Sequence, residues 1–207
     1  MIRSNLNLKL FFLLKIFLIT LVICLKPYED GLWAQNDLVA VGSNDAAVKI
    51  KIFSSLTCPH CAIFHIKVVP EIKKEYVNSG KVQLIFIDFP LDQAAFNASK
   101  LLHCLEQKKQ ITFLDTIYES QSKWTAGSNI NEINNNLKKI VKNLGINPTQ
   151  FNKCLNDEII GDKILNERIN GHKKYSINST PTIIINEKKH VGPTNFKNIK
   201  KTIEKLI

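Results

Sequence analysis

The sequence predicts an α/β fold in which one β-sheet is divided by a long helical insertion. Strand-like runs occupy residues 47–54, 81–89 and 181–192, whereas the segment between the last two has helical periodicity. The chain has 207 residues, of which 44% are hydrophobic and 22% are charged. This composition excludes collagen-like and acidic disordered chains, and the length allows one domain, or one domain with an inserted subdomain, to bury a core.

Residues 1–34 are predicted to be an export signal that is cleaved. Arg3 and Lys9 precede a mostly apolar run at residues 11–25. That run is shorter than the roughly 20 residues that a membrane-spanning helix needs. Ala34 is the best candidate for the cleavage site, and an uncut signal would instead anchor the chain in the inner membrane.

The charge and the cysteines limit the expected partners and compartment. The formal net charge is +10, but no Arg-rich stripe is interleaved with aromatic residues, so nucleic acid is not an expected partner. Cys24 is assigned to the apolar run of the signal. Of the 5 cysteines, the mature chain then keeps Cys58, Cys61, Cys104 and Cys154. An even number outside the reducing cytosol predicts two possible pairs.

The first part of the sheet is predicted from a strand, a helix and a strand. Residues 47–54 (AVKIKIFS) alternate, which predicts a strand with one solvated face. Residues 59–78 carry apolar side chains at helical spacing, with a kink expected near Pro70. Residues 81–89 (KVQLIFIDF) are nearly continuously apolar, as in a buried parallel strand. The three elements predict a right-handed crossover unit.

The insertion is predicted to be entirely helical. No strand pattern occurs between Asp92 and Tyr175. Helices of ordinary length are expected at residues 93–107, 111–122, 129–144, 147–156 and 162–175.

The sheet is predicted to resume after the insertion. Residues 181–186 (PTIIIN) predict a third strand, and Glu187–Lys188 predict a tight turn. Residues 189–192 then predict a partner strand, and residues 196–207 predict a closing amphipathic helix.

The clearest chemical motif is Cys58-Pro59-His60-Cys61, which follows a strand and opens a helix. Two cysteines at this spacing can close a small disulfide ring. Because a helix N-terminus favours a thiolate, Cys58 is the predicted nucleophile and Cys61 the resolving thiol. Pro59 suits the first helical turn, where its missing N–H would have no partner. A positive charge or hydrogen bond from His60 would favour the Cys58 thiolate, so an oxidising site is expected.

Three histidines leave other interpretations open. A zinc site would use the cysteine pair with His60, His65 or His103, but a second ligand pair at the usual spacing is missing, so no metal is predicted. His65 lies on the same helical face as Cys58. It is expected to be a half-exposed surface histidine, although this face would also bring it near the cysteines.

Thr180-Pro181 lies immediately before the third predicted strand. An ordinary turn proline is one interpretation. Beside the Cys58–Cys61 motif and a helical insertion, however, the sequence resembles the DsbA family of exported thiol oxidases, in which a cis-proline loop faces the disulfide. The resemblance also includes Ile87–Leu91 and Ser179–Thr182, and it covers the chain from about Asp37 to its end.

The resemblance implies a thioredoxin fold with an inserted all-helical domain. The thioredoxin-like domain would comprise residues 35–91 and 177–207, and the helical insertion residues 92–176. It implies a periplasmic enzyme that gives its disulfide to reduced, newly translocated proteins and is reoxidised by a membrane-bound, quinone-coupled partner. Thr180 and Pro181 would offer a backbone edge to an extended substrate. No dissociable cofactor is expected, because the disulfide stores both electrons, and a monomer is expected.

Two further points follow from the resemblance. The sequence most resembles the alphaproteobacterial-type members of the family, which often carry a second cysteine pair in the helical part. Cys104 and Cys154 fit that addition, with a loop of about 50 residues. Two buried free thiols are the alternative. Many members carry a buried Glu six residues before the first active cysteine, where this chain has Ile52. The group that handles the proton of the resolving thiol is therefore not identified.

Two other functions remain compatible with the sequence. A disulfide isomerase or reductase would use the same chemistry from the dithiol form. A peptide-binding module or chaperone would keep a binding groove without redox turnover. The reduction potential of the active cysteines separates the oxidase from the isomerase or reductase.

Overall fold

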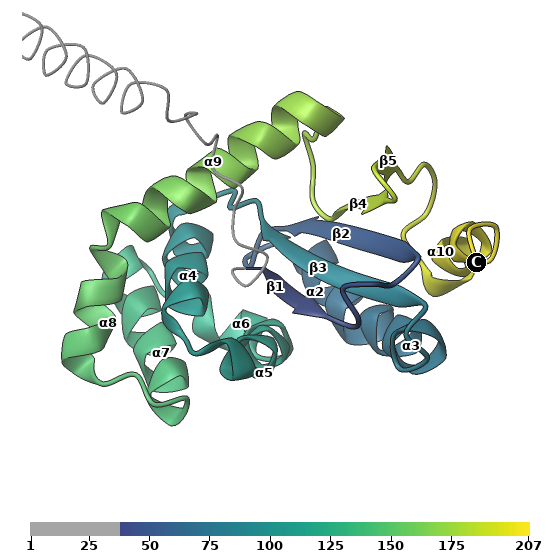
Figure 1. Cartoon of the computed structure of the whole chain (residues 1–207). Helices are drawn as coiled ribbons and strands as arrows, with labels where there is room; N and C mark the ends of the chain where they lie inside the picture. The colour runs from purple at the N-terminus through teal and green to yellow at the C-terminus, as the bar shows by residue number, and fades with distance from the viewer. Residues whose placement is uncertain (1–37) are drawn as a thin grey trace, which may run out of the picture. The chain divides into compact units, whose positions relative to one another are not determined.

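A computed structural model describes residues 38–207 of the chain (Figure 1). The predicted signal at residues 1–34 and its Cys24 lie outside the described residues. Within residues 38–207, no helix is long and apolar enough to cross a membrane.

A mixed five-stranded sheet lies at the centre of the described residues. Its strands are β1 (Val39–Val41), β2 (Val48–Ser54), β3 (Val82–Asp88), β4 (Thr182–Ile185) and β5 (Lys188–Lys189). They lie side by side in the order β1-β3-β2-β4-β5. The parallel pairing predicted for β2 and β3 is confirmed, and the other three pairs are antiparallel. The short strand β1 was not predicted.

The helix between β2 and β3 is interrupted, as the sequence predicts. It consists of α2 (Pro59–Lys67), α3 (Val69–Ile72) and a single π-helical segment, η2 (Lys73–Val77). Pro70 has no N–H to donate and disfavours helical geometry in the preceding residues, so the break falls just before it, at Val68.

The segment between β3 and β4 is helical throughout, as predicted. Its helices are α4 (Gln93–Cys104), α5 (Gln107–Glu119), α6 (Gln121–Trp124), α7 (Ile130–Asn143), α8 (Pro148–Leu155) and α9 (Glu158–Tyr175). Helices α4 to α8 gather at one end of the sheet, and α9 runs back from them toward β4 (Figure 1).

Side-chain caps set several helix starts. The side chains of Asp92, Asn129, Asn147 and Asp157 each accept a hydrogen bond from a backbone N–H in the following first turn. Such caps satisfy N–H groups that have no partner within the helix. The cap at Asp157 starts α9 four residues earlier than the predicted Asp162.

The turn between β4 and β5 lies one residue earlier than predicted. Asn186 and Glu187 have positive φ angles of 43° and 65°, and Lys188 already pairs with Ile185. Two successive positive φ angles are typical of two-residue hairpin turns, and Asn tolerates them well. The closing helix α10 (Phe196–Ile203) also ends four residues before the predicted Ile207.

Two clusters of buried side chains form most of the core. One lies between the sheet and helices α2, α3 and α10. The other joins the helices of the insertion to the start of α2, and it includes Cys58 and Cys61. The cysteine motif is therefore placed where the sheet meets the insertion.

Candidate active site

Cys58 lies directly after the loop that leaves β2, at the N-cap position of α2. Its backbone is extended, with φ −76° and ψ 120°, and Pro59 follows in the first turn. The Cys58 N–H donates to the carbonyl of Ser55 over 3.1 Å, and the Cys58 carbonyl accepts from Ala62 N–H. The sulfur thus projects from the positive end of the helix, where an anion is stabilised.

Cys58 and Cys61 are both free thiols, 8% and 1% exposed. The Cys58 thiol donates a hydrogen bond of 3.3 Å to the carbonyl of Thr180, and the peptide bond between Thr180 and Pro181 is cis. The fold therefore brings together two motifs that are 122 residues apart in the sequence. His60 is exposed on the first turn of α2.

The second sulfur has a different environment from the first. Burial raises the pKa of the Cys61 thiol to about 12, and the neighbouring Cys58 adds to the rise. The hydroxyl of Thr180 and the backbone at Ser55 oppose it. Thr180 Oγ1 is buried and otherwise has no hydrogen-bond partner. Cys61 is therefore an uncharged thiol at neutral pH, and Thr180 can stabilise its thiolate when one forms.

Side chains from the insertion hold the loop before Cys58. Gln121 Nε2 donates to the carbonyls of Leu56 and Cys58 over 2.8 and 3.1 Å. Thr57 donates to the carboxylate of Asp92 over 2.7 Å. Sequence reasoning missed both contacts. Asp92 had the local signal of an acidic residue before a helix, but nothing near Gln121 in the sequence indicates a partner in this loop.

The expectation that His65 is a half-exposed surface residue is wrong. Its side chain is buried, because this face of α2 packs against α5. Its Nε2 lies 2.7 Å from Asp115 Oδ1, and its ring centre lies 4.7 Å from that of Tyr118.

The histidines considered for zinc do not gather around the cysteines. His65 bonds Asp115, and His103 bonds Asp88 over 2.7 Å. Among the described residues, one group of three side chains brings metal-ligating atoms within 4.8 Å of one another, namely Asp88, His103 and Glu167. That group contains no cysteine.

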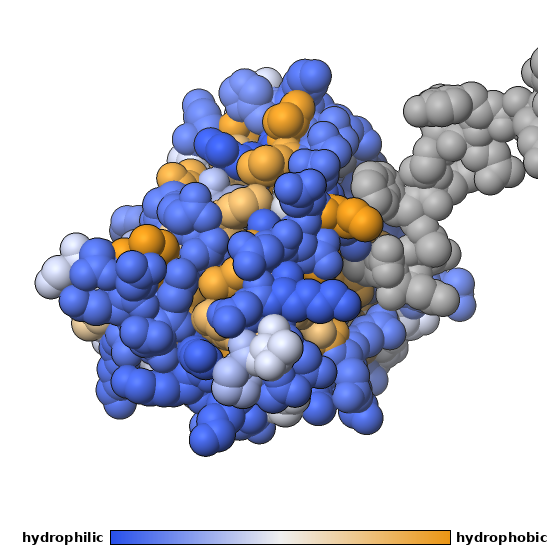
Figure 2. Space-filling view, turned by 90° about the vertical axis from the view of Figure 1, so that its left-hand side faces the viewer, coloured by the Kyte–Doolittle hydropathy of each residue, from blue (hydrophilic) through white to orange (hydrophobic). Residues whose placement is uncertain are grey.

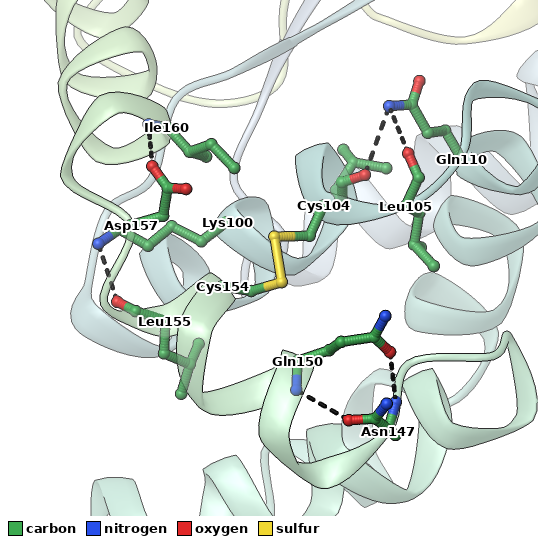
Figure 3. Close-up of a disulfide and its surroundings, with 11 residues drawn as sticks. Lys100, Cys104, Leu105, Gln110, Asn147, Gln150, Cys154, Leu155, Asp157 and Ile160 are labelled. Atoms are coloured by element: carbon green, nitrogen blue, oxygen red, sulfur yellow. Dashed lines mark hydrogen bonds between the residues drawn. A yellow bond between two sulfur atoms is a disulfide. The ribbon is translucent and has the colours of Figure 1, made fainter.

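Cys104 and Cys154 form a disulfide between α4 and α8, with their Cα atoms 6.0 Å apart (Figure 3). Two polar contacts support the same helices. Lys100 donates to the carbonyl of Leu155 over 2.9 Å. Asn147 and Gln150 form a reciprocal capping box at the start of α8.

Comparison with known proteins gives consistent similarities. A sequence profile described as thioredoxin matches residues 34–205. A probable disulfide bond formation protein D of Bacillus anthracis is 30% identical over 184 residues, which are 87% of this chain and 83% of that protein. A putative protein-disulfide oxidoreductase of Rickettsia bellii is 28% identical over 153 residues, 73% of this chain and 58% of that protein. The crystal structure of Wolbachia pipientis alpha-DsbA1 matches with a TM-score of 0.75 at 31% identity, covering 82% of this chain and 90% of that one.

Proposed function

We propose that this chain acts as an oxidase on reduced exported proteins. The premise is that the chain belongs to the thioredoxin family and is a DsbA-like protein thiol:disulfide oxidoreductase. The position of Cys58 carries this proposal. Cys58 lies at a helix N-terminus and is more exposed than Cys61, and its sulfur contacts the backbone of the Thr180-Pro181 loop. A thiolate stabilised there is a good leaving group, which favours giving the disulfide away.

The proposed reaction has two exchange steps. A substrate thiolate attacks the Cys58 sulfur of the Cys58–Cys61 disulfide, forms a mixed disulfide with Cys58, and releases Cys61, which takes up a proton. A second substrate thiolate then attacks the substrate sulfur of the mixed disulfide and releases the Cys58 thiolate. The substrate gains one disulfide, and its two electrons remain on the cysteine pair.

Thr180 and Pro181 are proposed to bind the substrate backbone. The carbonyl of Thr180 lies 3.3 Å from the Cys58 sulfur, so a peptide held at this edge has its cysteine within reach of the attacked atom. Pairing of an extended peptide with a backbone edge supplies affinity without demanding one sequence. Such binding suits an enzyme that oxidises many proteins.

The compartment, the reoxidising partner and the monomeric state belong to the same proposal. A cleaved signal at residues 1–34 would release the chain into the periplasm, where a membrane-bound, quinone-coupled partner would reoxidise it. N-terminal sequencing of periplasmic protein is expected to start at Gln35, after Ala34. Recovery of intact Met1 in the membrane fraction would show an uncut anchor instead.

The reduction potential of the Cys58–Cys61 pair tests the direction of the reaction. The mature protein is equilibrated with glutathione buffers, and its thiols are alkylated and assigned to peptides, so that the Cys104–Cys154 pair is scored separately. An oxidase is expected to lie well above the glutathione couple, toward the value of about −120 mV of a strong oxidant. A potential near or below the glutathione couple would assign the chain as an isomerase or reductase. Binding of reduced protein without turnover would show a peptide-binding module.

A further inference from the structure

The proton of Cys61 has to be taken up and given back in every catalytic cycle. The Cys61 side chain is 1% exposed, and burial raises the pKa of its thiol to about 12. Water therefore does not reach the sulfur directly, and the thiol does not ionise without an acceptor at neutral pH. Ile52, on the neighbouring strand β2, is itself buried and offers no polar group.

A buried tyrosine packs in the same cluster as the cysteine pair and lines a pocket at the end of β3. Tyr118 of α5 is buried, and burial raises the pKa of its hydroxyl; repulsion from the Cys61 sulfur, when it is a thiolate, adds to the rise. A hydrogen bond with Ser54 opposes this rise, and the charges of Asp88 and Cys58 add to it. Tyr118 thus belongs to the buried cluster that contains Cys61, and its hydroxyl bonds Ser54 at the end of β2.

The same three polar residues line one small pocket. Tyr118, Ser54 and Asp88 meet there, and Ser54 lies opposite Asp88 in the register of β2 and β3. The remaining walls are apolar and consist of Leu56, Phe86, Ile87, Leu102 and Leu114. Within this otherwise apolar pocket, these three residues are the ones with side chains that can carry a proton.

Asp88 continues the path to a histidine. The Asp88 carboxylate is buried, accepts a hydrogen bond from Ser99, and lies 2.7 Å from His103 Nε2. Burial lowers the pKa of His103, and the charge of Lys163 also lowers it. The hydrogen bond with Asp88 and the charges of Asp88 and Glu167 outweigh both effects, so the pKa of His103 is raised. Glu167 of α9 is only partly buried. One of its carboxylate oxygens lies within 4.8 Å of an Asp88 carboxylate oxygen and of a ring nitrogen of His103. The path therefore leads from the pocket toward the surface.

We propose that Asp88 and His103 are the proton acceptor and donor for Cys61, reached through the hydroxyls of Tyr118 and Ser54. When Cys61 attacks the Cys58 sulfur of a mixed disulfide, its proton passes along these hydroxyls to the Asp88–His103 pair. A Cys58–Cys61 bond forms, and the partner sulfur leaves as a thiolate. In the reverse step the pair returns the proton to the Cys61 thiolate. This inference rests on the redox roles proposed for Cys58 and Cys61, but not on the direction of the net reaction.

A second buried histidine supplies a matched control. His65 also bonds a carboxylate over 2.7 Å, that of Asp115, and its ring also lies against Tyr118. Asp115 is 48% exposed, however, and neither His65 nor Asp115 lines the pocket. If any histidine–carboxylate pair near Tyr118 served the reaction, replacing either histidine would slow proton transfer from Cys61 equally. The proposal requires that only loss of His103 changes proton transfer.

The test measures closure of the Cys58–Cys61 disulfide from the mixed disulfide of Cys58 with glutathione. Rapid acid quenching and mass spectrometry follow the reaction of the full mature chain, with Cys104–Cys154 intact, from pH 5 to pH 9. In the native chain the rate is expected to rise and then level off. In Tyr118→Phe and His103→Gln, closure at pH 7 is expected to be on the order of 10²-fold slower. Its rate should rise about tenfold with each pH unit, because only solvent then removes the proton.

One control variant and one further test variant make the result decisive. His65→Gln is expected to keep the native pH profile. Asp88→Asn should behave like His103→Gln. If the buried amide prevents Asp88→Asn from folding, the Tyr118→Phe and His103→Gln variants decide the question alone. Circular dichroism confirms beforehand that these two variants are folded. Native profiles for Tyr118→Phe and His103→Gln, or a lost plateau in His65→Gln, would overturn the proposal. A reducing potential in the native chain would refute the proposed oxidase and leave this result standing.

Discussion

At the scale of single residues, the two active sulfurs are made unequal by their surroundings. Cys58 lies at the N-cap position of α2 beside the Thr180 carbonyl, whereas Cys61 lies one turn further along the helix, more deeply buried, with its thiol pKa raised to about 12. A substrate thiolate can approach the first sulfur more easily than the second. The asymmetry supports the proposed roles, in which Cys58 is attacked and Cys61 is the resolving thiol.

Single cysteine replacements are expected to separate these roles. Cys58→Ser should abolish disulfide exchange, because the attacked sulfur is lost. Cys61→Ala should still be attacked at Cys58 but should accumulate mixed disulfides with substrate, because no resolving thiol is present. Non-reducing electrophoresis and mass spectrometry measure both, with an alkylated substrate as the control. Unimpaired turnover by Cys58→Ser would contradict the assignment.

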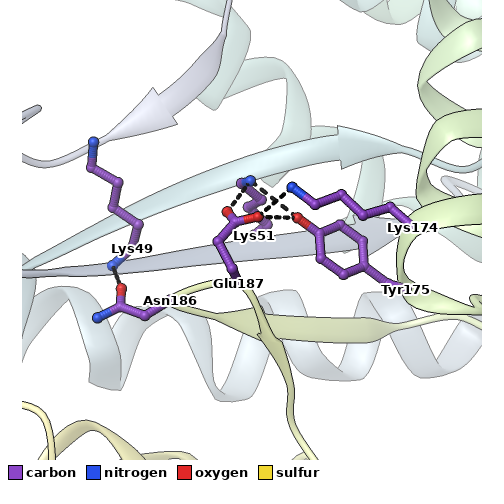
Figure 4. A network of polar contacts seen from close by, with 6 residues as sticks. All are labelled: Lys49, Lys51, Lys174, Tyr175, Asn186 and Glu187. Carbon is purple, nitrogen blue, oxygen red and sulfur yellow. Dashed lines mark hydrogen bonds and ion pairs between the residues drawn. The ribbon is translucent and has the colours of Figure 1, made fainter.

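Glu187 shows a second way in which contacts set the behaviour of a residue. Its carboxylate, in the turn between β4 and β5, is bonded by Lys51, Lys174 and the Tyr175 hydroxyl (Figure 4). These bonds lower the pKa of Glu187 from 4.5 to about 2, with Lys174 making the largest contribution. The contacts join β2, the turn and the end of α9.

The effect of Glu187 on stability is expected to depend on pH. Because the pKa is lower in the folded chain, the stabilisation is complete above about pH 4.5 and is lost as the pH falls toward 2. Glu187 is half-exposed, so solvent screening limits the contribution to about 1 kcal/mol. Urea unfolding of the native chain and Glu187→Gln from pH 2 to pH 7 measures it. A difference that grows below pH 4 would contradict this account.

Which site residues the sequence reveals depends on how far apart in the chain the contacts are made. Cys58 and Cys61 share one short motif whose chemistry is local. Gln121 and Tyr118 meet that motif only because the insertion folds against α2, and no sequence pattern records the contact. The prediction that His65 lies on the surface was wrong for the same reason. Its polar side chain gave no sign that this face of α2 is buried against the insertion.

At the scale of the elements, α9 shows how one small residue fixes the packing of a helix. Gly171 is buried in this helix against Phe53 of β2. A Cβ atom built on Gly171 would lie 2.5 Å from Phe53 Cε1, too close for a native contact. Glycine is usually unfavourable within a helix by about 1 kcal/mol relative to alanine. Here the close approach of the aromatic ring outweighs that preference.

Gly171→Ala is therefore expected to destabilise the chain by about 1–3 kcal/mol, although alanine is the better helix former. Gly161 in the same helix is a matched control, because its added Cβ would lie 3.0 Å from Lys100 Cε, a longer distance than the 2.5 Å to the Phe53 ring. Gly161→Ala should lower stability less. Thermal unfolding of both variants tests the comparison, and equal losses would refute it.

Most elements could be predicted because they carry strong periodicity. The alternating strand at residues 47–54 and the helical insertion needed no distant information. β1 escaped prediction because three residues, Val39–Val41, are too few for a pattern and become a strand only by pairing with β3. Helix and turn boundaries differ by a few residues from the predicted ones. A capping side chain sets the start of α9 at Asp157, and the backbone geometry of Asn186 sets the turn between β4 and β5.

At the scale of the whole molecule, the insertion and the sheet form one site together. Residues 38–207 form one compact unit. The insertion contributes the Gln121 bonds and much of the cluster that buries Cys61. Its outer face is mostly hydrophilic, with hydrophobic residues in several separate areas (Figure 2). The insertion therefore acts on the chemistry through its inner face.

The Cys104–Cys154 disulfide is expected to stabilise this arrangement mainly by restricting the unfolded chain. Its ends are 50 residues apart, and the loop between them contains α5, α6 and α7. Closing a loop of that length removes chain entropy worth about 4 kcal/mol as an upper value. The Lys100–Leu155 bond and the cap at Asn147 hold the same helices without it. The folded structure should therefore survive loss of the disulfide.

Replacing both Cys104 and Cys154 by alanine should lower the urea midpoint and raise the denaturant dependence, because the unfolded chain becomes more extended. A Cys58→Ser, Cys61→Ala chain with the disulfide intact is the control, since its unfolded state stays crosslinked. An unchanged midpoint with a normal circular dichroism spectrum would show that native packing alone fixes the insertion. A large fall with an unchanged denaturant dependence would instead assign the loss to contacts around the disulfide in the folded state, and not to chain entropy.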